Sequence, residues 1–164
     1  MDRIIGIDFG RKRIGLAVSD PLIVFASALE TVPSAKIIDY IKNYAQKETI
    51  IRFVVGYPKN MDNTPSEAAR DVDAFLGLLS KHFPSIPVTL EDERFTSVLA
   101  HRAMIDGGMK AKDRRDKNSV DKISAAIILQ GYLDRTSAGG TSFVRFPLSV
   151  PDSLSRNVTK KKHK

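Results

Sequence analysis

Two apolar runs constrain the fold of this chain most strongly: Arg3–Phe9, which is rich in isoleucine, and Ile50–Val55, which only Arg52 interrupts. Neither run alternates apolar with polar residues, as a strand with one solvent-facing side would. A segment with helical spacing, Ile37 to Ala45, lies between them. Continuous apolar strands that alternate with helices predict an α/β fold, in which a sheet is covered by helices on both faces.

Turn and cap signals predict the other elements of the first half. Phe9–Lys12 is a short turn, so the strand expected over Ile14–Ser19 runs antiparallel to the first. Ile23–Val32 is the third expected strand, and Ser34 is the expected N-cap of the helix that follows.

The second half continues the alternation of helices and strands. The expected features are a capping box at Thr64–Glu67 whose helix runs to about His82, a strand over Ile86–Leu90, a helix from Thr96 to Gly107-Gly108, and a last helix capped by Ser119 that ends near Asp134. The predicted order is three meandering strands, then helix, strand, helix, strand, helix, helix. It gives a five-stranded mixed sheet.

The positive charge is concentrated near the end of the chain. The 164 residues include 26 basic and 19 acidic ones, but Met1 to Asp134 holds 19 basic and 18 acidic residues. Arg135 to Lys164 holds seven basic residues and one acidic residue, and Ser137–Ser142 has linker composition. We therefore expect a domain over 1–134 and a basic, flexible tail over 135–164. The alternative is that Phe143–Leu148 packs on the domain as an extra element.

Several protein classes are excluded by what the sequence lacks. Without cysteine there are no disulfides, thiolate zinc sites or cysteine nucleophiles. No apolar run reaches the roughly 18 residues of a membrane helix, and MDRIIGIDFG does not read as a secretory signal, so we expect a cytoplasmic protein without a membrane partner. No GxxxxGK[ST] loop is present, which argues against a P-loop NTPase.

Three acids stand where a functional crevice is expected. Asp8 ends the first strand, Glu93 closely follows the last one, and Asp121 lies at the start of the last helix. Ligand sites in open α/β sheets lie at the carboxyl ends of parallel strands, so these acids meet if the first and last strands are parallel. Each also has a structural alternative. Asp8 could open a turn, and Glu93 could pair with Arg94 or Arg52. Asp121 could be an acid that the helix dipole stabilises in the first turn of the helix.

Carboxylates placed together repel each other unless a cation neutralises them. Oxygen ligands suit Mg²⁺ or Mn²⁺, and a cluster of this kind could hold two ions about 4 Å apart for phosphodiester hydrolysis. Gly10 and Gly15 would let a bulky backbone approach this edge, although turn geometry explains Gly10 equally well. A basic cluster could contact phosphates or simply form a solvated loop: Lys110, Lys112, Arg114, Arg115 and Lys117.

Five segments together resemble a known family: Ile5–Gly10, Arg13–Val18, Val54–Asp62, Asp92–Ser97 and Val120–Leu129. They are similar to the YqgF (RuvX) family of pre-16S rRNA nucleases, a branch of the ribonuclease H-like superfamily close to Holliday junction resolvases. The resemblance covers roughly residues 1–134 and does not include the tail.

The resemblance implies a ribonuclease H-like fold and a set of functional residues. Asp8, Glu93 and Asp121 would be the catalytic carboxylates that bind two Mg²⁺ or Mn²⁺ ions. Gly56 and Pro58 would shape a loop beside the active edge, while Arg94 and the segment 112–117 would face nucleic acid.

The function expected from this likeness is that of an endonuclease acting at the 5′ end of precursor 16S ribosomal RNA, as a monomer or weak dimer. One alternative is a Holliday junction resolvase acting on four-way DNA, which would need two symmetric active sites and hence a dimer. The other alternative is a non-catalytic RNA-binding assembly factor.

Overall fold

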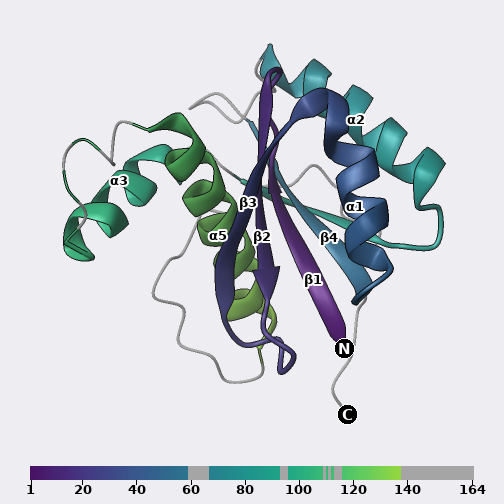
Figure 1. Ribbon diagram of the computed structural model, residues 1–164, viewed down its shortest axis with the longest axis horizontal. Helices are drawn as coiled ribbons and strands as arrows, with labels where there is room; N and C mark the ends of the chain where they lie inside the picture. The colour runs from purple at the N-terminus through teal and green to yellow at the C-terminus, as the bar shows by residue number, and fades with distance from the viewer. Residues whose placement is uncertain (59–66, 93–95, 109, 111, 113–115, 138–164) are drawn as a thin grey trace.

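A computed structural model describes residues 1–58, 67–92, 96–108, 110, 112 and 116–137 (Figure 1). Its five strands form one sheet in the order β3-β2-β1-β4-β5. The strands are β1 Asp2–Asp8, β2 Arg13–Ser19, β3 Ala26–Pro33, β4 Thr49–Tyr57 and β5 Val88–Asp92. β1, β4 and β5 are parallel, whereas β2 and β3 run antiparallel to their neighbours. The mixed five-stranded sheet is therefore confirmed.

Helices cover both faces of this sheet, as Figure 1 shows. They are the short 3₁₀ helix η1 Ser34–Lys36, α1 Ile37–Ala45, α2 Ala68–His82, α3 Thr96–Asp106 and α5 Lys117–Thr136. α1 and α2 lie on one face, while α5 packs on the other and α3 packs against α5. The predicted order of elements and the coverage of both faces are confirmed.

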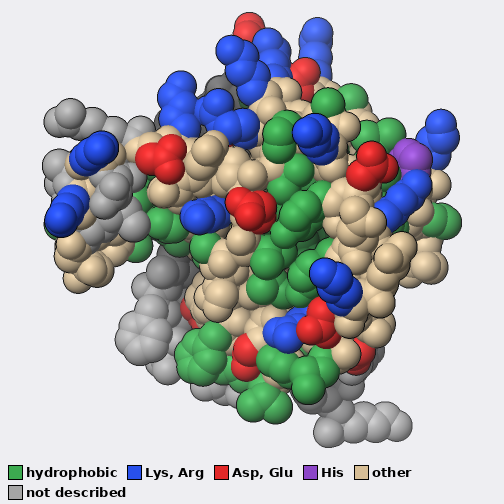
Figure 2. Space-filling model, in the orientation of Figure 1, with side chains coloured by type: hydrophobic (Ala, Val, Ile, Leu, Met, Phe, Trp, Pro, Cys, Tyr) green, Lys and Arg blue, Asp and Glu red, His purple; other side chains and the backbone are tan. Residues whose placement is uncertain are grey.

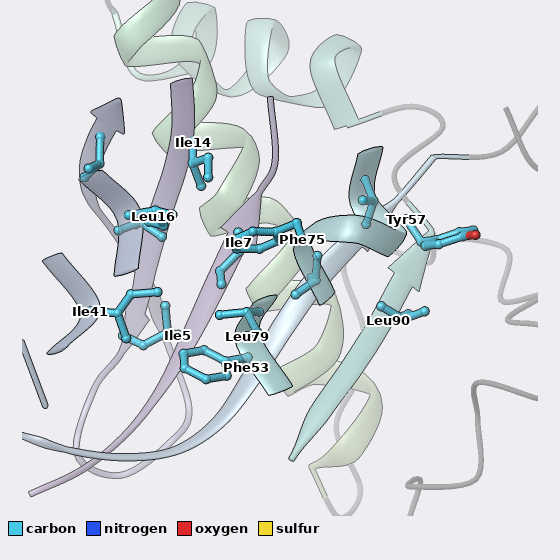
Figure 3. Packing of buried hydrophobic residues seen from close by; sticks show 14 of the residues in the cluster. Ile5, Ile7, Ile14, Leu16, Ile41, Phe53, Tyr57, Phe75, Leu79 and Leu90 are labelled. Atoms are coloured by element: carbon cyan, nitrogen blue, oxygen red, sulfur yellow. The ribbon is translucent and has the colours of Figure 1, made fainter. Parts of the chain in front are cut away.

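Two hydrophobic cores follow from the alternation of side chains along the central strands. Ile5 and Ile7 of β1 point to the α1–α2 face, where they join Phe53 and Leu79 (Figure 3). The residue between Ile5 and Ile7 is Gly6, which points to α5 and leaves space for it: a Cβ there would lie 2.7 Å from Leu129 Cβ. The chain needed apolar residues at successive positions because each central strand is buried on both sides.

Four expectations about element ends are wrong. The strand expected over Ile86–Leu90 is β5, which runs over Val88–Asp92 instead. β3 begins at Ala26 rather than Ile23, because Ile23 has a φ of 58° and belongs to the turn before the strand. Ser34 does not cap a helix through its side chain: its Oγ donates to Gly10 O and Arg11 O, at 2.9 and 2.7 Å. Ser119 is not the cap of α5 either.

The N-cap of α5 is Asp116, whose carboxylate accepts from Asn118 N at 3.3 Å and from Ser119 Oγ at 3.0 Å. The helix therefore starts two residues before Ser119, and Asp121 lies beyond its first turn. Because the helix-dipole effect falls off within that turn, the dipole stabilises Asp121 only weakly and does not explain its position.

Two other helix ends were expected from sequence. Gly107-Gly108 ends α3 as expected, with Gly108 at a φ of 74°. Residues 64–66 of the predicted capping box lie outside the described residues, and α2 is described from Ala68. Within the described part of the chain, no helix is long and apolar enough to cross a bilayer.

A buried ion pair fastens the end of α5 to the sheet. Glu91 of β5 is 1 % exposed and pairs with Arg135, which the charge count above placed in the tail but which lies in α5. Burial raises the pKa of Glu91, and the Arg135 guanidinium opposes that rise. The guanidinium also lies over the Tyr132 ring, 5.5 Å from its centroid.

We expect Arg135→Gln to lower the free energy of unfolding by about 2–3 kcal/mol, because it leaves a buried carboxylate without its cation. This loss is smaller than the roughly 3–5 kcal/mol of a fully buried pair, because the Arg135 side chain is partly exposed and solvent screens its charge. Chemical denaturation measures the change, with Arg70→Gln on the exposed surface of α2 as the control. The double variant Glu91→Gln/Arg135→Gln should recover most of the loss. Equal effects of the Arg70 and Arg135 changes would show that the pair is not stabilising.

Candidate active site

Asp8 lies at the centre of the edge where the parallel strands end. It is the last residue of β1, and the other two parallel strands, β4 and β5, end in Tyr57 and Asp92, which pair with each other in register. Asp8 follows Gly6 by two positions, so its side chain points to the same face as Gly6, the face that α5 covers. The predicted position of Asp8 at the carboxyl end of a central strand is confirmed.

Gly15 brings Asp121 to the same place. It pairs with Asp8 across the β1–β2 ladder, and a Cβ at this position would lie 2.0 Å from the Asp121 carbonyl oxygen. The backbone of α5 therefore rests directly on the backbone of β2. Directly paired residues share a face of the sheet, so the structure brings Asp8 and Asp121 to one face at neighbouring strands. Gly10 differs: its absent Cβ would lie 2.5 Å from Arg13 O, which is a demand of the turn itself.

Asp121 is partly buried and faces a cation. Its side chain is 28 % exposed, and burial raises its pKa while Arg13 and Lys117 oppose the rise. Arg13 Nε lies 3.5 Å from Asp121 Oδ2, which is an ion-pair distance rather than a close hydrogen bond, and this Nε has no hydrogen-bond partner among the described residues. Arg13 thus supplies positive charge beside the acid. In the sequence, Arg13 was noted only as part of the segment Arg13–Val18, and its proximity to Asp121 was not predicted.

The third predicted acid, Glu93, lies outside the described residues, as does Arg94. The residue before Glu93 is Asp92, which is 2 % exposed and ends β5 at the same edge as Asp8. Among the described residues, no three acidic, histidine or cysteine side chains form a group that could hold a metal ion. The convergence of Glu93 with the other two acids therefore stays a prediction.

The predicted basic cluster is described only in part. Lys110, Lys112 and Lys117 are exposed, and Arg114 and Arg115 lie outside the described residues. Lys117 opens α5 one turn before Asp121, and its charge acts on that carboxylate. Of the described residues of this cluster, Lys117 is the one whose charge is shown to act on Asp121.

The β1–β2 turn forms one wall of a cavity at this edge. The cavity has a volume of about 500 Å³ and lies between Phe9 and Gly10, the Pro58 end of β4 and the start of α2. Arg11 closes the turn against α2, with its Nε 2.6 Å from Asp71 Oδ2. Gly56 is buried in β4 opposite Glu91, two positions before Pro58.

The contacts that fix the β1–β2 turn were not predicted from the sequence. Ser34 ties the turn to the end of β3 through the two carbonyls named above and through its own N–H, which donates to Lys12 O at 3.0 Å. A polar residue directly after a strand was visible in the sequence, but its acceptors are more than twenty residues away. No local signal pointed to them.

The fold is similar to that of two solved structures. A structure of RuvC from Thermus thermophilus in complex with Holliday junction substrate matches with a TM-score of 0.51 and 20 % identity, over 82 % of this chain and 95 % of that one. A second T. thermophilus RuvC structure has the same TM-score. The ribonuclease H-like fold is therefore confirmed.

Sequence comparison gives closer relatives. Proteins of Phocaeicola vulgatus and Parabacteroides distasonis, each named "Putative pre-16S rRNA nuclease", are 53 % and 54 % identical over 134 residues. Each match covers 82 % of this chain and 96 % of the relative. The family RuvX, described as Holliday junction resolvase, matches residues 2–135. This chain therefore belongs to the RuvX family, as the motifs predicted.

Proposed function

We propose that this protein is a metal-dependent nuclease that hydrolyses phosphodiester bonds of precursor 16S ribosomal RNA. The observation that carries the proposal is that the Asp121 backbone of α5 rests on Gly15, the β2 residue that pairs with Asp8. The names of relatives about 50 % identical to the chain support the reaction and the substrate. The protein would then act in ribosome biogenesis in the cytoplasm.

The donor set fits divalent cations. Asp8 and Asp121 offer carboxylate oxygens, and Glu93 directly follows the buried end of β5. Hard cations such as Mg²⁺ and Mn²⁺ prefer oxygen ligands. Burial disfavours the charged form of Asp121 and raises its pKa, and a bound cation would stabilise that charged form. Two such ions supply an activated water and stabilise the leaving oxygen when they are bound.

Each residue then has a distinct part. Asp8 would be the central ligand of the ions, and Glu93 and Asp121 would complete the ligand set. Lys110, Lys112 and Lys117, with Arg94, Arg114 and Arg115, contact the phosphates of the substrate strand. Gly56 and Pro58 would shape the loop beside the active edge, where Pro58 lines the cavity against α2.

A nuclease assay on the full chain tests this function. Purified protein is incubated with 5′-extended 16S ribosomal RNA and with a four-way DNA junction, each with Mg²⁺, with Mn²⁺ and with a chelator. We expect metal-dependent cleavage of the RNA, and none by the Asp8→Asn variant prepared in parallel. No cleavage of either substrate would favour a non-catalytic assembly factor.

Junction resolution is the second candidate, because the matching family is described as Holliday junction resolvase. Symmetric cleavage of a four-way junction needs two related active sites, so this activity requires a dimer. Preferential cleavage of the junction by a protein that sediments as a dimer would favour it over RNA processing.

Metal binding should be visible as stabilisation. If the acids converge, Mn²⁺ at a hundred times its dissociation constant raises the free energy of unfolding by about 2.7 kcal/mol. Glu93→Gln and Asp121→Asn should each lose much of this gain, because an amide is a poorer ligand than a carboxylate. Asp106→Asn, an exposed acid at the end of α3, is the control and should keep the gain. Thermal melts with and without Mn²⁺ measure the difference; equal gains in all four proteins would place the metal elsewhere.

A further inference from the structure

The turn between β2 and β3 has an apolar tip. Leu22, Val24 and Phe25 are 82 %, 47 % and 66 % exposed, at positions where turns usually carry glycine, asparagine, aspartate or serine. Figure 2 shows hydrophobic side chains gathered at the lower end of the molecule, where Figure 1 places this turn. Three large apolar side chains on one turn are more than the scattered exposure of ordinary surfaces.

The backbone of this turn is held in a strained shape. Ile23 has a φ of 58°, in the left-handed region that β-branched residues rarely adopt. The Asp20 carboxylate fixes the loop by accepting from Val24 N at 2.7 Å and from Phe25 N at 2.9 Å. Ile23 packs toward the α5 core while its neighbours stay exposed. A strained backbone that its surroundings hold in place is typical of functional segments. In this turn the strained backbone leaves the apolar side chains exposed to solvent.

Gln130 of α5 clamps the same turn. Its Nε2 donates to Val24 O at 3.1 Å, and its Oε1 accepts from Ala26 N at 2.9 Å. α5 ends at Thr136, six residues later, which is about 9 Å along the helix axis. The chain therefore leaves α5 close to the apolar turn.

The segment that follows α5 contains an apolar stretch within reach. Ser137–Ser142 is polar and small, and Phe143–Leu148 carries Phe143, Val144, Phe146 and Leu148. Six extended residues span up to about 20 Å, more than the 9 Å between the helix end and Gln130. The family match ends at residue 135, and the relatives above match over 134 residues, which is 96 % of their length. The apolar stretch is thus an addition to the family domain.

We propose that Phe143–Leu148 docks on the apolar turn formed by Leu22, Val24 and Phe25. The two surfaces are joined by a short linker, which gives an effective concentration in the millimolar range and favours this contact over one with a second copy of the chain. The basic residues from Arg156 onward then extend from an anchored point rather than from the helix end. The sequence left two roles for the tail, a flexible basic segment or an extra element packed on the domain. The apolar turn favours packing on the domain.

Cysteine cross-linking tests the contact directly, because the chain has no cysteine of its own. Phe25→Cys is combined in the full chain with Phe146→Cys, and oxidised at low protein concentration. The matched controls pair Phe25→Cys with Ser142→Cys or Ser149→Cys, which have similar reach but flank the apolar stretch. We expect the intramolecular disulfide to form at least tenfold faster in the Phe146 pair. Equal rates at all three positions, or disulfide-linked dimers as the main product, would overturn the proposal.

A double-mutant cycle followed by thermal denaturation tests the same contact without introducing cysteine, which could itself weaken docking. Leu22→Ser/Phe25→Ser and Phe143→Ser/Phe146→Ser should each lower the thermal midpoint by about 3–6 °C, because each removes apolar contacts of one interface. The quadruple variant should melt no lower than the less stable double variant. Unchanged midpoints, additive losses, or a midpoint that rises with protein concentration would each overturn docking within one chain.

Discussion

Asp8→Asn is expected to slow phosphodiester cleavage by at least about a hundredfold, because the central carboxylate of the proposed metal site is replaced by a neutral, weaker ligand. Asp8 ends β1, the middle strand of the sheet, and pairs with Gly15 of β2. Single-turnover cleavage of 5′-extended RNA measures the loss.

The same variant should remain folded. Asp8 and Asp121 carry like charges on one face, so removing one of them should leave the metal-free thermal midpoint unchanged or raise it. Asp39→Asn, an exposed acid on α1, is the control and should cleave at the parent rate. Cleavage by Asp8→Asn within threefold of the parent would contradict the mechanism.

The sequence was sufficient for the sheet and for the position of Asp8 at the end of its first strand. Asp8 follows a continuous apolar run, and the parallel pairing of β1, β4 and β5 puts the ends of these strands at one edge. These features are local or follow from general rules of α/β topology, which is why a pattern of residues predicts them. Glu93 lies outside the described residues, so its part in the site rests on the sequence and the family resemblance.

The details that the sequence did not predict depend on distant partners. Ser34 looked like a helix cap because only its neighbours were visible, whereas its hydroxyl donates to carbonyls of the β1–β2 turn. Arg135 was counted as part of a basic tail, but its charge is paired with buried Glu91. In both residues a contact across the fold overrides the local preference, and the identity of that contact is not encoded in nearby residues.

Gly15→Ala tests the contact that brings the site together. The added Cβ would lie 2.0 Å from Asp121 O and 2.8 Å from Lys122 N, both of them backbone atoms of a helix that cannot rotate away. Since real Cβ contacts stay beyond 3.0 Å, α5 must move by about 1 Å or more. Overpacking on this scale costs about 3 kcal/mol, which corresponds to a thermal midpoint lower by roughly 6–12 °C.

The activity should fall further than the stability alone explains. A displacement of about 1 Å at catalytic groups costs on the order of a hundredfold in rate, so folded Gly15→Ala should cleave about a hundredfold more slowly and gain less stability from Mn²⁺. Gly77→Ala is the matched control, because a Cβ at Gly77 in α2 meets no atom within 4 Å. That variant should melt at or slightly above the parent midpoint and keep full activity, since alanine favours the helix. A Gly15→Ala protein with the parent's midpoint, cleavage rate and Mn²⁺ response would mean that α5 does not need to rest on β2 for Asp121 to reach Asp8, and the proposed site would lose its structural basis.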